Sequence, residues 1–172
     1  LPKIGAIVKT ADGEGEVCGV ETLKEIIKEI RSAIKANDLN NVKKLLEENP
    51  SLIKAQTPFG SFLHEATMQG KYNIAEYLIR KGINVNNKNG LGNTSALREA
   101  AYSGNINILK LLYDNGANID ITSSEENPLF AAIPNNHIEI VKYLVDQGID
   151  ITAKYDIGET KNCDAMEYAR QY

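Results

Sequence analysis

The sequence is poor in the residues that most often carry metal, disulfide or redox chemistry. Its 172 residues include two cysteines, two histidines and no tryptophan. Cys18 and Cys163 stand near opposite ends of the chain, which matches neither a disulfide framework nor a zinc-ligand spacing. We therefore expect no bound metal and a reducing, cytoplasmic environment.

Two further absences narrow the class of partner. The chain has no apolar run long enough to cross a bilayer, so we expect no membrane partner. Its formal charge is -4 at pH 7, whereas nucleic-acid-binding domains usually present an excess of positive charge, so we expect no nucleic acid partner. With 42% hydrophobic and 24% charged residues, the composition is that of an ordinary globular protein, and the order of the residues has to supply the rest.

One phrase of the sequence occurs twice. GKYNIAEYLIRKGINVN (70–86) is followed by GNINILKLLYDNGANID (104–120), and weaker copies begin at Asn37 and Asn136. The copies recur about every 33 residues, a period typical of repeat proteins. In each copy, apolar residues at positions i, i+3 and i+4 predict a helix with one buried face.

A second, shorter helix precedes each of these. Its copies SFLHEATMQG, ALREAAYSG and NPLFAAIPNN are rich in alanine, whose small side chain lets neighbouring helices approach closely. Gly82, Gly116 and Gly148 predict the ends of the longer helices, because glycine adopts the left-handed conformation without a Cβ clash. Pro134 predicts that the last of the short helices ends near Ile133.

The helix pair followed by an extended turn resembles the ankyrin repeat. SFLH (61–64) stands where that family has Thr-Pro-Leu-His, and GAN (116–118) stands where it has Gly-Ala-Asp. His64 keeps the histidine that links neighbouring turns in the family, whereas Arg98 and Phe130 replace it in the next two units. The resemblance covers residues 29–172. It implies an all-α ankyrin-repeat solenoid of about four and a half helix-turn-helix units, with approximate bounds 21–56, 57–89, 90–122, 123–154 and a partial 155–172.

Residues 1–20 lie outside the repeat pattern. Two β-prone runs flank the glycine-rich ADGEG, which predicts a β-hairpin extension that covers the first unit. LPKIGAIVKTADGEGEVCGVETLKEIIK (1–28) also resembles the tail of bacterial YaaT-like sporulation proteins, in which Leu23–Ile30 would contain a third strand. The same residues fit a helical stripe, and we favour the helix because Glu25 and Lys28 would share its exposed face.

Groups that suggest catalysis have simpler structural explanations. Gly13, Gly15 and Gly19 approach a dinucleotide-binding fingerprint, but they are misspaced and stand in the predicted hairpin. His64 and His137 occupy positions where the resemblance implies turn-linking and helix-opening roles. We therefore expect no catalytic residue, no cofactor and no enzyme activity.

Two pairs of residues recur at equivalent positions of successive units. Glu65 and Glu99 should form a column of carboxylates that binds a basic partner or, since Ala131 interrupts it, is only a solvated face. Met68 and Tyr102 are large side chains at positions expected to face solvent, which makes them candidate contact residues.

Ankyrin stacks bind proteins on the concave face formed by their turns and short helices, so the resemblance implies a non-enzymatic protein–protein interaction module. We expect its partner to be an unidentified intracellular protein with a basic surface. Two other functions stay open, namely an assembly scaffold tied to a YaaT-like complex through the N-terminal segment, and an enzyme subunit. The predicted partner-binding residues are Gly60, Glu65, Met68, Gln69, Leu91, Asn93, Thr94, Glu99, Tyr102, Ser103, Ser124, Glu126 and Asn135.

Overall fold

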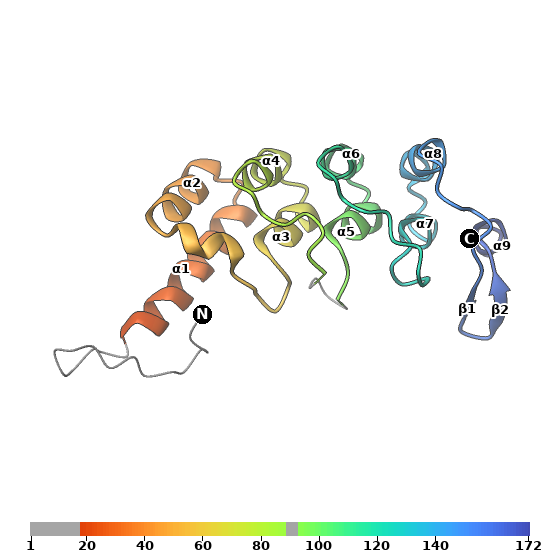
Figure 1. The fold of residues 1–172 in the computed structure, drawn as a ribbon, viewed down its shortest axis with the longest axis horizontal. Helices are drawn as coiled ribbons and strands as arrows, with labels where there is room; N and C mark the ends of the chain where they lie inside the picture. Colours follow the sequence, from red (N-terminus) through yellow and green to blue (C-terminus); the bar gives the residue numbers. More distant parts are fainter. Residues whose placement is uncertain (1–17, 89–92) are drawn as a thin grey trace.

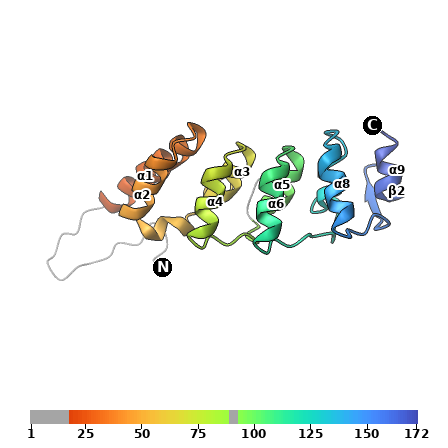
Figure 2. The same ribbon diagram turned by 90° about the horizontal axis from the view of Figure 1, so that it is seen from above.

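The computed structural model describes residues 18–88 and 93–172, which form a row of helix pairs. The inner helices α1, α3, α5, α7 and α9 form one layer, and the outer helices α2, α4, α6 and α8 form the other (Figure 1). Successive pairs lie side by side along the long axis (Figure 2). The predicted repeat solenoid is therefore confirmed. Its elements are α1 (Cys18–Lys35), α2 (Leu39–Glu48), a 3-10 helix (Pro50–Lys54), α3 (Phe62–Met68), α4 (Tyr72–Arg80), α5 (Ala96–Tyr102), α6 (Ile106–Asp114), α7 (Pro128–Ala132), α8 (Ile138–Asp146), β1 (Tyr155–Ile157), β2 (Thr160–Cys163) and α9 (Ala165–Ala169).

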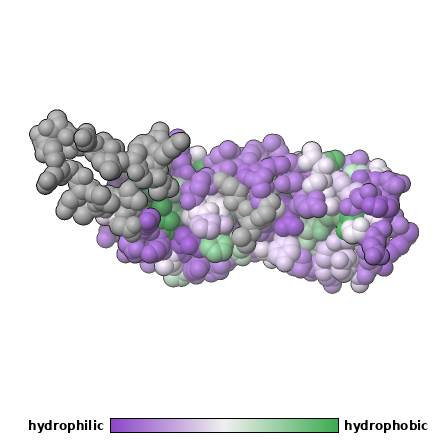
Figure 3. All heavy atoms as spheres, turned by 90° about the horizontal axis from the view of Figure 1, so that it is seen from below, coloured by the Kyte–Doolittle hydropathy of each residue, from purple (hydrophilic) through white to green (hydrophobic). Residues whose placement is uncertain are grey.

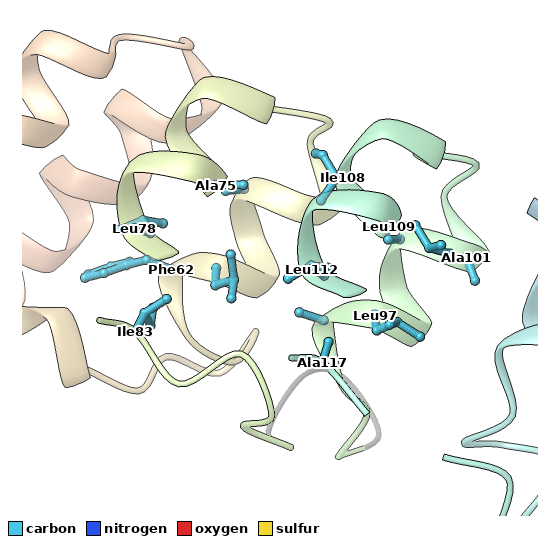
Figure 4. Close-up of a cluster of buried hydrophobic side chains, with 14 of the residues drawn as sticks. Phe62, Ala75, Leu78, Ile83, Leu97, Ala101, Ile108, Leu109, Leu112 and Ala117 are labelled. Atoms are coloured by element: carbon cyan, nitrogen blue, oxygen red, sulfur yellow. The ribbon is translucent and has the colours of Figure 1, made fainter. Parts of the chain in front are cut away.

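The core continues from unit to unit because each helix pair buries its apolar face against the next pair. Leu78, Leu97 and Leu112, from two successive units, are at most 1% exposed and lie in one buried cluster (Figure 4). Burying a leucine contributes about 2 kcal/mol relative to leaving it exposed. The predicted role of the small alanines is confirmed, since Ala66 and Ala100 of the inner helices are fully buried. One unit alone could not bury these faces.

Left-handed backbone marks the turn from each inner helix to its outer helix. Gly70 and Gly104 have φ of 65° and 75°, and Asn37 and Asn136 have φ of 58° and 54° at the equivalent positions. Asparagine tolerates this conformation better than most residues. Glycine is required in the third unit, because a Cβ at Gly104 would lie 2.6 Å from the ring of His137. The copies of the sequence phrase therefore begin where the chain reverses direction.

The predicted helix ends are also confirmed. Gly82, Gly116 and Gly148 follow the outer helices with φ of 84°, 85° and 80°. Helix α7 ends at Ala132, and its C-cap, Ile133, directly precedes Pro134, as predicted. Among the described residues, no helix is long and apolar enough to cross a membrane.

The N-terminal prediction is corrected in part. Most of the hairpin predicted for residues 1–20 falls on residues outside the described ranges. Its last part, Cys18–Val20, belongs to α1, so the chain is helical where the second strand was predicted. The helix also includes Leu23–Ile30, which confirms the helix and excludes the third strand. Once Ile30 and Ile34 are buried against the stack, adding residues to the same helix gains one backbone hydrogen bond each.

A short antiparallel hairpin near the C-terminus was not predicted. Strands β1 and β2 pair Tyr155 with Cys163 and Ile157 with Thr160, before α9 begins. The strands are too short to show a period-2 pattern, and only Gly158, with φ of 56°, marks the turn between them. The Tyr155 hydroxyl donates to the Ile121 carbonyl at 2.6 Å and accepts from Asn127 Nδ2 at 3.1 Å, which ties the hairpin to the end of the third unit and the start of the fourth.

Candidate partner-binding surface

Exposed side chains lie at both ends of the inner helices. We use the name inner surface for the last turn of each inner helix together with the loop that precedes that helix. The view in Figure 3 looks onto the inner layer of the solenoid, and the part not drawn in grey is mostly hydrophilic with small, separate apolar areas. Such a surface is typical of a binding face that stays soluble when it is unoccupied.

The predicted partner-binding residues differ in how far they are exposed to solvent. Tyr102 is an exposed aromatic residue among them, with 51% of its surface accessible. Leu91 lies outside the described residues. Gln69, Asn93, Tyr102 and Asn135 are exposed; Met68, Ser103, Ser124 and Glu126 are partly buried; and Gly60, Glu65, Thr94 and Glu99 are buried.

Glu65 is an internal ion-pair partner and not a surface charge. Its side chain is 5% exposed, and its carboxylate accepts hydrogen bonds from Arg31 Nε at 2.7 Å and Nη2 at 3.3 Å. The Lys35 ammonium lies 4.0 Å away. Removing a carboxylate from water costs several kcal/mol unless partners of this kind compensate. Because α1 covers Glu65, its charge does not face a partner, contrary to the prediction.

Glu99 is also buried, but its polar contacts come from its own unit. It is 5% exposed, accepts a hydrogen bond from the Thr94 hydroxyl at 2.6 Å, and lies 3.7 Å from the Arg98 guanidinium. Ala131, the equivalent residue of the fourth unit, is 2% exposed. This position is buried in three successive units, so the predicted column is neither an exposed binding ladder nor a solvated face.

The residue directly before this position links each unit to the next, and we name it the link position. It is occupied by Arg31, His64, Arg98 and Phe130 in the first four units. The His64 ring lies 2.9 Å from the Ser61 hydroxyl through Nδ1 and 3.1 Å from the Thr94 carbonyl through Nε2. Since a carbonyl only accepts, Nε2 carries the proton. Burial lowers the pKa of His64, which keeps the ring neutral, and the predicted turn-linking role is confirmed.

The other link residues reach the next unit by different chemistry. Arg98 Nε donates to the Glu125 carbonyl at 3.0 Å. Phe130 packs edge-on against Tyr155 with ring centroids 5.0 Å apart, and it stacks on Tyr168 at 4.8 Å. The link position therefore accepts an ion pair, hydrogen bonds or an aromatic cluster.

Two exposed aromatic rings on the inner surface lie against these arginines. The Arg31 guanidinium lies 4.6 Å from the centre of the Phe59 ring, and the Arg98 guanidinium lies 5.4 Å from the centre of the Tyr102 ring. Phe59 is 39% exposed. Cation–π contacts hold both rings in place while one face of each stays accessible. Phe59 was not among the predicted binding residues, although an aromatic residue in the turn TPFG (57–60) is a signal for such a site.

Acidic groups of the later loops are mostly engaged between units. Lys88 forms an ion pair with Asp120, and its ammonium lies 3.6 Å from Glu126. The hydrogen bond from Lys88, with further ones from Thr122, lowers the pKa of Asp120 to about 2. Glu126 is therefore bound within the protein, whereas Glu125 is exposed.

The described part of the chain contains no group of three or more histidine, cysteine, aspartate or glutamate side chains that could hold a metal ion. Burial raises the pKa of the Cys163 thiol, which disfavours the nucleophilic thiolate. A hollow of about 450 Å³ lies between α8 and α9, lined mainly by apolar groups that include Ile138, Val141 and Tyr172. The His137 ring at its edge is engaged with the Tyr102 carbonyl at 3.0 Å.

Comparison with known proteins decides the family. A model of ankyrin repeats in three copies matches residues 30–123 and 63–155, which together cover most of the chain. The chain belongs to the ankyrin repeat family. Members of this family are generally non-enzymatic protein–protein interaction modules, which supports an interaction module in general terms for this ankyrin repeat chain. The match begins at residue 30, and the resemblance of residues 1–28 to YaaT-like proteins stays a prediction.

Individual relatives of this ankyrin chain come from distant organisms. A putative ankyrin repeat protein of Rickettsia felis is 38% identical over 102 residues, covering 55% of this chain and 45% of the relative. Alpha-latrocrustotoxin-Lt1a of Latrodectus tredecimguttatus is 34% identical over 131 residues, covering 74% of this chain and 9% of the toxin. Protein fem-1 homolog A-like of Mus musculus is 38% identical over 79 residues, covering 46% and 12%. The chain spans less than half the length of each of these relatives.

Proposed function

We propose that the chain binds a partner protein on its inner surface and has no catalytic activity of its own. The observation that carries the proposal is the pair of exposed aromatic rings, Phe59 and Tyr102, each supported by an arginine. Tyrosine and arginine are enriched among the residues that contribute most to binding energy. Met68, the last residue of α3, and Gln69, its C-cap, lie between these two rings in the chain and supply further contact area.

The inner surface is ordered before a partner arrives. Arg98 supports Tyr102 and is itself held by the Glu125 carbonyl, and Arg31 supports Phe59 while it pairs with Glu65. Side chains that are already fixed lose less conformational entropy on binding. The proposed mechanism is therefore docking onto a preformed surface.

Retention of a partner on the immobilised chain tests the proposal. Lysate of the source cell is passed over the native chain, a Met68→Ala/Tyr102→Ala variant and a Tyr72→Ala variant. Tyr72 is 40% exposed and lies at the start of an outer helix, so its loss controls for the removal of an exposed tyrosine. We expect the native chain and Tyr72→Ala to retain the same protein, and the double variant to lose most of it.

Circular dichroism and thermal unfolding of all three forms show whether the fold is kept. Equal retention by the native chain and a folded double variant would place the binding site outside the inner surface. Retention that is lost only in Tyr72→Ala would place it on the outer helices.

A further inference from the structure

The outer helix α8 presents an apolar face to solvent. Ile138, Val141 and Val145 follow one another at steps of three and four residues, which places them on one side of the helix. Ile138 is 54% exposed, Val145 is 43% exposed, and Val141 is partly buried. We name these three residues the end face. In the described part of the chain, α8 is the last helix of the outer row, and α9 lies in the inner row (Figure 1).

The equivalent residues of the third unit are covered by a helix. Counted from the left-handed residue of each turn, Ile106, Leu109 and Tyr113 of α6 occupy the same positions as the end face. Leu109 is fully buried, and Ile106 and Tyr113 are partly buried. The Tyr113 ring contacts Tyr143 of α8 edge-on, with ring centroids 6.1 Å apart. The next outer helix therefore covers this face of α6, whereas the same face of α8 is open.

The hollow between α8 and α9 adjoins the end face. Its volume is about 450 Å³. Ile138 and Val141 line it, together with Pro134, Ala169 and Tyr172. The open side of α8 is therefore concave as well as apolar, and apolar grooves of this kind bind the apolar face of an amphipathic helix.

We propose that the end face binds an amphipathic helix of a partner protein, in the way that α6 receives α8. The helix carries an apolar residue, a tyrosine three positions later and a second apolar residue directly after it, as Ile140, Tyr143 and Leu144 of α8 do. We name these three the stripe residues. The proposal goes beyond the proposed function, because it assigns a second docking surface on an outer helix.

Lys142 gives the tyrosine of this pattern a specific contact. In the third unit, the Lys110 ammonium lies 5.2 Å from the centre of the Tyr143 ring. Lys142 stands at the position equivalent to Lys110 and also lines the hollow. Its ammonium lies 3.4 Å from the Glu139 carboxylate, but both side chains are exposed, and an ion pair in water holds a lysine only weakly. Lys142 can therefore form the same cation–π contact with a docked tyrosine.

A second copy of this chain fits the end face less well than a foreign helix. Two copies related by a two-fold axis at this face would set one hollow against the other and leave both unfilled. The α8 helix of another copy cannot offer its stripe residues, because Ile140 and Leu144 are at most 1% exposed in their own core. The structure therefore favours a helix from a different protein.

Fluorescence anisotropy with a helical peptide tests the proposal on the full chain. The probe is a labelled copy of residues 136–148, the segment that packs as α8 against α6. A lactam bridge between the Lys142 and Asp146 side chains of the peptide, which are exposed in α8, keeps the probe helical, since an isolated helix of this length is marginal. The comparison peptide carries serine in place of the three stripe residues.

The variants of the chain compare one repeat position in two units. Ile138→Asp and Val145→Lys place on the end face the charges that the helix dipole favours at the start and the end of α8. Tyr72→Asp is the matched control, because Tyr72 begins α4 as Ile138 begins α8 and is 40% exposed. Circular dichroism and thermal unfolding of each variant show whether the fold is kept.

We expect the probe to bind the native chain and Tyr72→Asp equally. Ile138→Asp and Val145→Lys should each bind it about tenfold more weakly, because a charge replaces an apolar contact. The serine peptide should show no binding to the native chain. The Met68→Ala/Tyr102→Ala variant should bind the probe as the native chain does, which separates the end face from the inner surface.

Four results would overturn the proposal. The lactam-bridged probe could fail to bind the native chain, the serine peptide could bind as well as the probe, or Tyr72→Asp could lose as much affinity as Ile138→Asp. Sedimentation equilibrium could also show a dimer of the native chain that becomes a monomer in Ile138→Asp, which would make a second copy the occupant. None of these results changes the retention of a lysate protein through Tyr102, which tests the proposed function.

Discussion

The first and fourth units fill the link position in opposite ways. Arg31 uses a bidentate ion pair to a buried carboxylate, whereas Phe130 uses contacts to two aromatic rings. The backbone around them follows the same pattern, with left-handed residues Asn37 and Asn136 at equivalent turns. The solenoid therefore constrains the shape of the space between units more strongly than the chemistry of the side chains that fill it.

The two solutions differ in what they demand of their neighbours. An ion pair requires one particular partner, because removing either group leaves the other charged and buried. An aromatic cluster requires volume and edge-to-face or stacked geometry, and it tolerates changes of identity that preserve both. His64 lies between these cases, since its two hydrogen bonds are directional but carry no net charge.

The largest effect is expected for Phe130→Ala. Phe130 is 6% exposed, and truncating such a ring creates a cavity against Tyr155 and Tyr168 that costs about 3–4 kcal/mol of the free energy of unfolding. Urea unfolding followed by far-ultraviolet circular dichroism measures the loss. Phe59→Ala is the matched control and should cost less than about 1 kcal/mol, because that ring is 39% exposed. Equal losses in the two variants would mean that Phe130 is no more important for stacking than a surface ring.

A smaller loss, about 2 kcal/mol, is expected for Arg31→Met, since Glu65 would remain buried with only the Lys35 ammonium nearby. The double variant Arg31→Met/Glu65→Leu should recover most of that loss, because replacing both members of a buried pair with apolar groups is often neutral. The coupling between the two substitutions is read from a double-mutant cycle in urea. Additive losses would contradict the ion pair as the first unit's link.

The pH dependence of stability separates the histidine link from the others. Burial holds the pKa of His64 below the unfolded value, so the unfolded chain binds a proton that the folded chain does not. The contribution of His64 to the free energy of unfolding should therefore be fully present above about pH 6.5. It should fall as the pH drops below that value, by at most about 1.4 kcal/mol per pH unit. Unfolding free energies between pH 7 and pH 5 should show a flatter profile for His64→Gln. An unchanged profile in that variant would assign the pH dependence to other groups.

The smallest effect on stability is expected for Tyr102→Ala. Half of this side chain is already in water, so its removal should change the free energy of unfolding by less than about 1 kcal/mol. The measurement is the same urea titration that is used for Phe130→Ala. A loss as large as that of Phe130→Ala would show that Tyr102 is a packing residue and not a binding residue.

Most of the fold could be predicted from the sequence because it depends on short-range patterns. Helical periodicity places the outer helices, and the glycines after them need positive φ whatever surrounds them. The hairpin of β1 and β2 could not be predicted in this way. Its strands are short, and the contact that anchors it joins Tyr155 to Ile121 across 34 residues.

The candidate site was predicted less well because exposure depends on neighbouring units. Glu65 and Glu99 are charged residues on short helices, and a single unit gives no reason to bury them. Their burial follows from groups outside the short helix, namely Arg31 of the previous unit and the Thr94 hydroxyl of the preceding loop. Tyr102, in contrast, lies at the end of its helix, where the repeat pattern alone indicates exposure.

Site-specific photocrosslinking tests the central claim most directly. A photoreactive residue replaces either Tyr102 at the end of α5 or Lys110, which is exposed on the outer helix of the same unit. Each chain is irradiated in lysate of the source cell, and crosslinked proteins are identified by mass spectrometry. Binding on the inner surface predicts one protein that crosslinks to position 102 and not to position 110. A protein that crosslinks only to position 110 would contradict binding on the inner surface.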